Sequence, residues 1–220
     1  MKNHLKRIAA PRTWMLSRKS EKFTLRPNPG SHKLDEGMPL GTLLRDHLKL
    51  CKTLREAQKL LNNNEVFVDN KRKKDRREMV GLFDVIKIPS LSKNITIDLD
   101  LKGRLIVRDI DEKNLNVKVC RVLGKSIVKG NKLQLNLIGG KNLITDKINI
   151  KVGDSVLLNI GNNEIQEILP LKKDTKVLLV GGKHSGTRGK LKEIDRVIAK
   201  YVDEKGEEHL TRRSYVYVLN

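Results

Sequence analysis

The sequence has 220 residues, and its 46 lysines and arginines outnumber 26 aspartates and glutamates to give a net charge of +20. This length allows one to three small domains, and such a charge attracts polyanions. A membrane surface is also anionic, but the chain has no apolar run of about twenty residues, no secretory signal and no exposed amphipathic anchor. We therefore expect a cytoplasmic protein that binds nucleic acid and no membrane.

Sequence signatures of catalysis and metal binding are missing. There is no GxSxG, HExxH or dinucleotide-binding motif, and the glycine-rich stretch 181–191 lacks the spacing of a Walker loop because Leu191 follows Gly189 and Lys190. Cys51 and Cys120 have no partner at CxxC spacing, so we expect two reduced, buried thiols and no zinc site. The sequence predicts no enzymatic activity, no cofactor and no small-molecule substrate.

Residues 1–38 form a basic arm in which prolines and a glycine interrupt every periodic pattern. Alone in water, the arm could not bury enough apolar surface to offset the entropy of ordering it. Trp14 is its largest apolar anchor, and packing within the protein is favoured over stacking on a base. We expect the arm to thread between RNA helices and to fold as it binds. Its cations are Lys2, Lys6, Arg7, Arg12, Arg18, Lys19 and Arg26.

Two amphipathic helices are predicted next. In residues 39–52, leucines share one side of the helix, and Arg45, Lys49 and Lys52 share the other. Thr53 begins the second helix with Glu56 three residues later, the spacing of a capping box. Apolar residues bury one side of this helix, whereas Arg55 and Lys59 lie on the other. The sequence therefore predicts a cationic face over two helices.

A basic hairpin follows the helices. Residues 66–68 alternate as a strand does, and Asp69-Asn70 is a tight-turn signal because asparagine tolerates positive φ. Residues 71–77 then carry six cations against one carboxylate, and residues 80–88 return as an apolar strand. This loop would add to the cationic face of the helices. Its cations are Lys71, Arg72, Lys73, Lys74, Arg76 and Arg77.

From about residue 92 the pattern changes to short strands with closely spaced turns. Residues 92–170 predict an antiparallel barrel, because closure protects the edges of short strands. Residues 171–220 predict a second small β module, in which the loop GGKHSGTRGKL carries Lys183 and Arg188.

Three resemblances to known families and motifs narrow this prediction. The pieces PL…LRDHLK, EAQKLL, VFVDNK and GLFDVI closely resemble the S-four RNA-binding domain, although Asn70 stands where that domain usually has glycine. The run HLKRIAAP, Trp14 and PG…H in residues 4–34 resemble the start of the archaeal and eukaryotic small-subunit ribosomal protein family S-four-e. The glycine-rich loop resembles the KOW motif. The resemblance to the family extends over nearly the whole chain, and its end looks archaeal.

The resemblance implies an α+β protein in four parts: a basic N-terminal extension (1–38), a small α/β S-four domain (39–91), a central β-barrel (92–170) and a KOW-type, SH3-like β domain (171–220). It implies a structural protein of the small ribosomal subunit, on the cytoplasmic ribosome, whose partners are the 5′ domain of ribosomal RNA and neighbouring ribosomal proteins. The alternatives are an RNA-modification accessory protein and a KOW-type transcription factor. The predicted RNA-binding residues are Lys6, Arg7, Arg12, Arg18, Lys19, Arg45, Lys49, Lys52, Arg55, Lys59, Lys71, Arg72, Lys73, Lys74, Arg76, Arg77, Lys183 and Arg188.

Overall fold

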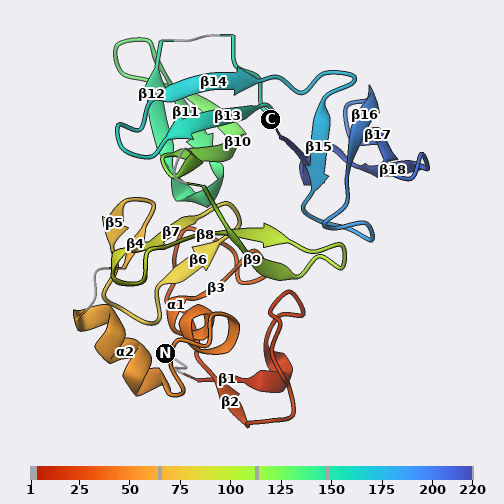
Figure 1. The fold of residues 1–220 in the computed structure, drawn as a ribbon. Helices are drawn as coiled ribbons and strands as arrows, with labels where there is room; N and C mark the ends of the chain where they lie inside the picture. Colours follow the sequence, from red (N-terminus) through yellow and green to blue (C-terminus); the bar gives the residue numbers. More distant parts are fainter. Residues whose placement is uncertain (1–3, 64–65, 112–113, 147–148, 220) are drawn as a thin grey trace. The chain divides into compact units, whose positions relative to one another are not determined.

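The structure, a computed structural model, describes residues 4–63, 66–111, 114–146 and 149–219 (Figure 1). The chain divides into two compact units. Unit 1 comprises Met1–Asp98 and Arg104–Asn116, and unit 2 comprises Leu99–Gly103 and Val117–Asn220. The four-part division 1–38, 39–91, 92–170 and 171–220 stays a prediction. None of the helices in the described ranges has the length and apolar character needed to cross a bilayer.

The two predicted helices of unit 1 are present, but the first is shorter than expected. α1 (Leu40–Thr42) continues into one π-helical stretch, η2 (Leu43–His47). The helix predicted to reach residue 52 ends there, because the chain reverses through Lys49 at a φ of 54° before the buried Cys51. α2 (Leu54–Asn63) then buries Ala57 and Leu61. Short 3-10 turns lie at η1 (Arg7–Ala9) and η3 (Pro89–Leu91).

Within the described ranges, three antiparallel sheets complete unit 1. β1 (Leu5–Lys6) pairs with β2 (Phe23–Thr24), and β3 (Gly37–Pro39) pairs with β6 (Met79–Gly81). The largest sheet has the order β5-β4-β7-β8-β9. Its strands are β4 (Phe67–Val68), β5 (Lys71–Arg72), β7 (Val85–Ile88), β8 (Lys93–Leu99) and β9 (Leu105–Asp109). Most of the segment from residue 92 to 109, expected in the central barrel, therefore extends the sheet of unit 1.

The described residues of the arm are folded onto the rest of unit 1. Trp14 is 2% exposed, and its Nε1 donates to the carbonyl oxygens of Gly37 at 2.7 Å and of Leu34 at 3.2 Å. The expected packing of Trp14 within the protein is confirmed. The backbone amide of Leu105 also donates to the carbonyl of Thr13, so the arm supports the edge strand β9. The expectation that the arm orders only on RNA therefore differs from the structure, because Trp14 finds its apolar and polar partners inside unit 1.

The described part of unit 2 contains two five-stranded antiparallel sheets. The first, with the order β12-β11-β10-β13-β14, curls around the long strand β10, whose register shifts between Val122 and Gly124. The second has the order β18-β17-β16-β15-β19. The first contains β10 (Val117–Val128), β11 (Lys132–Leu137), β12 (Asn142–Thr145), β13 (Ser155–Asn159) and β14 (Ile165–Leu169). The second contains β15 (Lys176–Leu179), β16 (Arg188–Ile194), β17 (Ile198–Asp203), β18 (Glu208–Arg212) and β19 (Val216–Val218).

The two sheets of unit 2 share a hydrophobic core. Leu157 and Leu169 of the first sheet pack in one cluster with Tyr201 and Val216 of the second, and the backbone amide of Val218 donates to Ser155 Oγ at 3.2 Å. The buried Cys120 lies in a separate cluster inside the first sheet, and Cys51 and Cys120 are both free thiols, as expected. The predicted α+β class is confirmed in its coarser content: the fold is mostly β, with few helices and several small antiparallel sheets.

Candidate nucleic-acid interface

The start of α2 positions the first group of exposed cations. Thr53 Oγ1 accepts a hydrogen bond from the amide of Glu56 at 3.2 Å, and Glu56 Oε2 accepts from the amides of Lys52 at 2.8 Å and Thr53 at 3.4 Å. The backbone hydrogen bond from Lys52 is the main reason why the pKa of the exposed Glu56 carboxyl lies below its ordinary value. The predicted capping box is confirmed. Because the helix buries its opposite side, Arg55 and Lys59 stay exposed.

The basic hairpin is held against α2. Asp69 and Asn70 have φ values of 49° and 60°, so the loop joining β4 to β5 has the positive φ at both positions that a two-residue type I′ turn requires. Asparagine adopts this conformation without the glycine that is usual in the S-four domain. Gln58 Nε2 of α2 donates to the carbonyl of Lys74 at 2.7 Å. This bond fixes the basic loop beside the helix.

Seven of the predicted residues are exposed along these elements, and we call them the helix–hairpin face. In the described part of the chain, none of the lysines among them forms an ion pair or hydrogen bond through its side chain. The five lysines of the face therefore present their charge to solvent, and Arg72 Nη2 donates to the carbonyl of Asn62 at 3.5 Å. Its members are Lys49, Lys52, Arg55, Lys59, Lys71, Arg72 and Lys74.

Three other predicted cations of the loop contact the protein itself. Lys73 Nζ lies 2.7 Å from Glu78 Oε2. Arg76 Nη1 donates to the carbonyl of Leu54 at 3.0 Å, and Arg77 Nε donates to the carbonyl of Arg26 at 3.1 Å. Arg76 and Arg77 therefore join the loop to α2 and to the arm.

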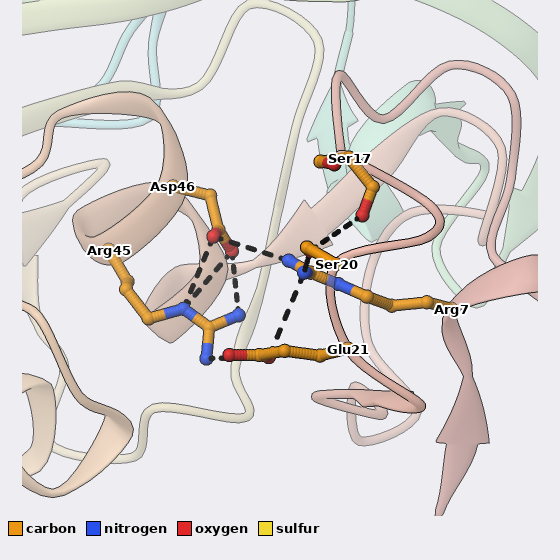
Figure 2. A network of polar contacts seen from close by, with 6 residues as sticks. All are labelled: Arg7, Ser17, Ser20, Glu21, Arg45 and Asp46. Carbon is orange, nitrogen blue, oxygen red and sulfur yellow. Dashed lines mark hydrogen bonds and ion pairs between the residues drawn. The ribbon is translucent and has the colours of Figure 1, made fainter.

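Figure 2 shows the polar contacts between the arm and η2, which we call the arm network. Arg7, whose side chain is 5% exposed, donates to Ser20 Oγ and lies 3.4 Å from Asp46 Oδ1 and 3.7 Å from Glu21 Oε2. Arg45 Nη2 lies 2.9 Å from Asp46 Oδ2, and its Nη1 lies 4.0 Å from Glu21 Oε2. Two guanidinium groups thus face two carboxylates. The positive charge of Arg7 and Arg45 is largely balanced within unit 1.

Among the remaining predicted cations of the arm, one contacts the protein and three are exposed to solvent. Arg18 donates to the carbonyls of Ile8 at 2.9 Å and Ala10 at 3.0 Å, so it holds the arm's own backbone. Lys6, Arg12 and Lys19 are exposed. Arg26 is half-buried, and Lys2 lies outside the described residues.

The predicted glycine-rich loop of unit 2 connects β15 to β16. Gly186 has a φ of 89°, and a Cβ there would lie 1.8 Å from the carbonyl oxygen of Asp100, so only glycine fits this close approach. Lys183 is exposed in the loop, and Arg188 is half-buried at the start of β16. The loop therefore packs on the turn 100–103, and it presents one exposed cation of the predicted pair.

A second cationic region in unit 2 was not predicted. Its members come from four distant places in the sequence, so no local motif could have indicated it. It is lined by Arg121, Lys151, Arg196, Arg212 and Arg213.

Comparisons with known proteins identify the family. A model of the RS4NT (NUC023) domain matches residues 1–35, and a model of the ribosomal family S4e matches residues 92–165. The chain is 42% identical to the small ribosomal subunit protein eS4 of Methanosphaera stadtmanae and 37% identical to that of Methanothermobacter thermautotrophicus; both alignments cover 99% of this chain and 92% of the relative. The crystal structure of the 30S ribosomal protein S4e from Thermoplasma acidophilum matches with a TM-score of 0.72 at 27% identity, over 84% of this chain and 95% of that one. This chain belongs to the ribosomal protein family S4e.

Proposed function

We propose that this chain is a structural protein of the small ribosomal subunit, and that it binds ribosomal RNA mainly through the helix–hairpin face. It is not an enzyme, because the family is a structural component of the ribosome. Its place is on the cytoplasmic ribosome, with ribosomal RNA and other ribosomal proteins as partners. The observation that carries the RNA-binding surface is the set of exposed cations along α2 and the basic loop.

The proposed mechanism is electrostatic. Each exposed lysine or arginine that neutralises a phosphate releases a condensed counterion, which supplies affinity and makes it depend on salt. Such contacts position the protein without reading sequence, and folded RNA is recognised mainly by its shape and its exposed groups. A rigid array of cations on a helix and an attached hairpin suits a partner of fixed shape.

The predicted cations take two different roles in this proposal. Arg7, Arg45, Arg76 and Arg77 position the arm and the loop on unit 1, because their guanidinium groups already contact protein atoms. Lys6, Arg12 and Lys19 extend the RNA contacts of the helix–hairpin face along the arm. The arm would then dock on RNA as an ordered element.

The finer assignments belong to the same proposal. Residues 39–91 would be an S-four domain, and residues 171–220 would be a KOW-type module in which Lys183 and Arg188 approach RNA or a neighbouring protein. The 5′ domain of the small-subunit RNA is the expected partner because the family resemblance implies it.

Sedimentation of a cell extract tests the function directly. The tagged chain should travel with the small subunit in a gradient at low salt and should stay with it through a moderate salt wash. A chain that stays at the top of the gradient in both conditions would contradict the proposal.

A further inference from the structure

Unit 2 has a cleft of about 890 Å³ whose lining is strongly cationic. It lies between the start of the β10 bulge, the turn 151–153, the residues before β17 and the end of β18. Five of its eleven lining residues are lysine or arginine, and none is acidic. Within the described residues, these five cations form no ion pair. A concave surface focuses the field of like charges, so the cleft is a strong site for an anion.

The floor of the cleft is formed by a buried arginine that the surrounding backbone holds in place. Arg121 is 8% exposed, and its guanidinium donates to the carbonyls of Ser214 at 2.5 Å and Arg213 at 3.1 Å while lying 5.4 Å from the ring centroid of Tyr217. Its Nε is buried and has no hydrogen-bond partner among the described residues. Burial lowers the pKa of Arg121 from its ordinary value, yet an arginine in a protein keeps its proton. A fixed positive charge thus lies beneath the cleft.

The walls are held together by a second arginine. Arg213 Nη2 donates to the carbonyl of Val152 at 3.1 Å, and its backbone amide donates to the carbonyl of Val197 at 2.8 Å. Gly153, at a φ of 101°, forms the turn against which Arg213 packs. Arg121 and Arg213 therefore organise the site, and the side chains of Lys151, Arg196 and Arg212 remain exposed for a ligand.

The rim of the cleft is apolar. Leu123, which the β10 bulge leaves outside the pairing register, is 52% exposed, and Val197 is 67% exposed. Val152 is also exposed on the same lining. A phosphate contact does not need these side chains, whereas an unpaired nucleotide offers both a phosphate and the apolar face of a base.

We propose that this cleft binds an unpaired segment of RNA, with its phosphates on Lys151, Arg196 and Arg212 and its bases against Leu123 and Val197. A regular duplex is a poorer occupant, because its bases are stacked on one another and cannot reach the apolar rim. The inference rests on the proposed function, and it adds a second RNA contact in unit 2, separate from the helix–hairpin face.

The test uses the full chain with a single-stranded oligouridylate and with an RNA duplex of the same length. The cleft variant is Lys151→Gln/Arg196→Gln/Arg212→Gln, which leaves Arg121 and Arg213 in place. The matched control is Lys125→Gln/Lys129→Gln/Lys132→Gln, which removes the same charge from exposed positions of the β10–β11 hairpin. Affinity is measured over a series of salt concentrations, and circular dichroism confirms that each variant folds.

For oligouridylate, the cleft variant should lower the slope of log affinity against log salt by about 0.7 for each lost phosphate contact, or about 2 in all, and should change the slope for the duplex less. The control should change neither slope by a comparable amount. Equal losses in the cleft variant and the control, or an equal loss for the duplex, would overturn the proposal. Unchanged RNA binding with reduced incorporation into the subunit would also overturn it, and would indicate an acidic protein segment as the occupant.

A second variant, Leu123→Gln/Val197→Gln, keeps every cation. It should weaken oligouridylate binding severalfold at an unchanged salt slope, and an unaltered affinity would show that the bases do not contact the rim.

A variant of the helix–hairpin face, Lys71→Gln/Arg72→Gln/Lys74→Gln, distinguishes a failure of the cleft assignment from a failure of the proposed function. If it weakens RNA binding while the cleft variant does not, only the cleft assignment fails. If the unmodified chain binds no RNA, the proposed function fails.

Discussion

The arm network and the helix–hairpin face are both rich in arginine and lysine, but they differ in their carboxylates. In the arm network, Asp46 and Glu21 lie within 4.0 Å of Arg7 and Arg45. The exposed lysines of the helix–hairpin face have no comparable neighbour in the described part of the chain. In the arm network, the positive charge holds two segments of unit 1 together. On the helix–hairpin face, the positive charge remains available to a binding partner. Positive charge in a basic protein therefore has two uses, which only the surroundings distinguish.

Replacing the anchor of the arm should have the largest effect. We expect Trp14→Ala to lower the free energy of unfolding by about 3–5 kcal/mol, because it removes a large buried side chain and leaves the carbonyls of Gly37 and Leu34 without their donor. Chemical denaturation measures the change. Phe23→Ala is the control, since Phe23 is 45% exposed and should cost well under half as much. An effect of Trp14→Ala no larger than that of Phe23→Ala would mean that Trp14 does not anchor the arm to unit 1.

Removing a member of the arm network should have a smaller effect on the same quantity. Arg7→Met should destabilise the chain by about 2 kcal/mol, because Asp46 and Ser20 lose a charged, buried donor. The salt dependence of RNA binding should hardly change. Lys6→Met, at the exposed neighbouring position, is the control for stability. A reduced salt slope with unaltered stability would place Arg7 among the residues that bind phosphate.

The helix–hairpin face should give the reverse pattern. Lys71→Gln/Arg72→Gln/Lys74→Gln should change stability by no more than about 0.5 kcal/mol, because these side chains are exposed. The slope of log affinity against log salt should fall by about 0.7 to 0.9 for each lost contact. The triple glutamine variant of the β10–β11 hairpin again controls for net charge. A slope equal to that of the control would exclude the basic loop from the interface.

The smallest expected effect is a dependence of stability on pH near the arm network. Burial lowers the pKa of His47 from its ordinary value despite the opposing charge of Asp46, and its Nε2 is buried with no partner among the described residues. The unfolded chain therefore binds a proton below about pH 6.5 that the folded chain resists, so stability should fall as pH drops from 7 towards 5. His47→Gln should flatten this part of the curve, by less than about 1.4 kcal/mol per pH unit. An identical curve for both proteins would show that His47 does not contribute.

The sequence predicts local structure correctly where a few neighbouring residues determine it. The capping box of Thr53 and Glu56 and the tight turn at Asp69-Asn70 are of this kind, since each depends on contacts within four residues. The first helix was predicted too long, because its leucine pattern continues past His47 while the chain turns at Lys49. Periodicity records which residues are apolar, and it does not show where the backbone must reverse to bury them.

The charged contacts could not be read in the same way. Arg7 and Asp46 are 39 positions apart in the sequence, and Arg121 contacts the carbonyl of Ser214 over 93 positions. Both arginines belong to a basic chain in which any cation could bind phosphate, so composition favoured one role for all of them. Only the tertiary structure determines which cations contact carboxylates or carbonyls and which are exposed to solvent. The same limit hid the cleft of unit 2, whose cations are scattered from residue 121 to residue 213.

The chain passes between the two units three times, after Asp98, after Gly103 and after Asn116. Unit 1 consequently cannot finish its largest sheet during synthesis until β9 has left the exit tunnel, by which time the first residues of unit 2 are already made. A proteolytic cut after Asp98 or after Gly103 would separate the edge strand β9 from the rest of its sheet, whereas a cut after Asn116 keeps that sheet in one fragment. Fragments intended for separate study should therefore be divided at residue 116, where the last crossing occurs, with the turn 99–103 retained in the first piece.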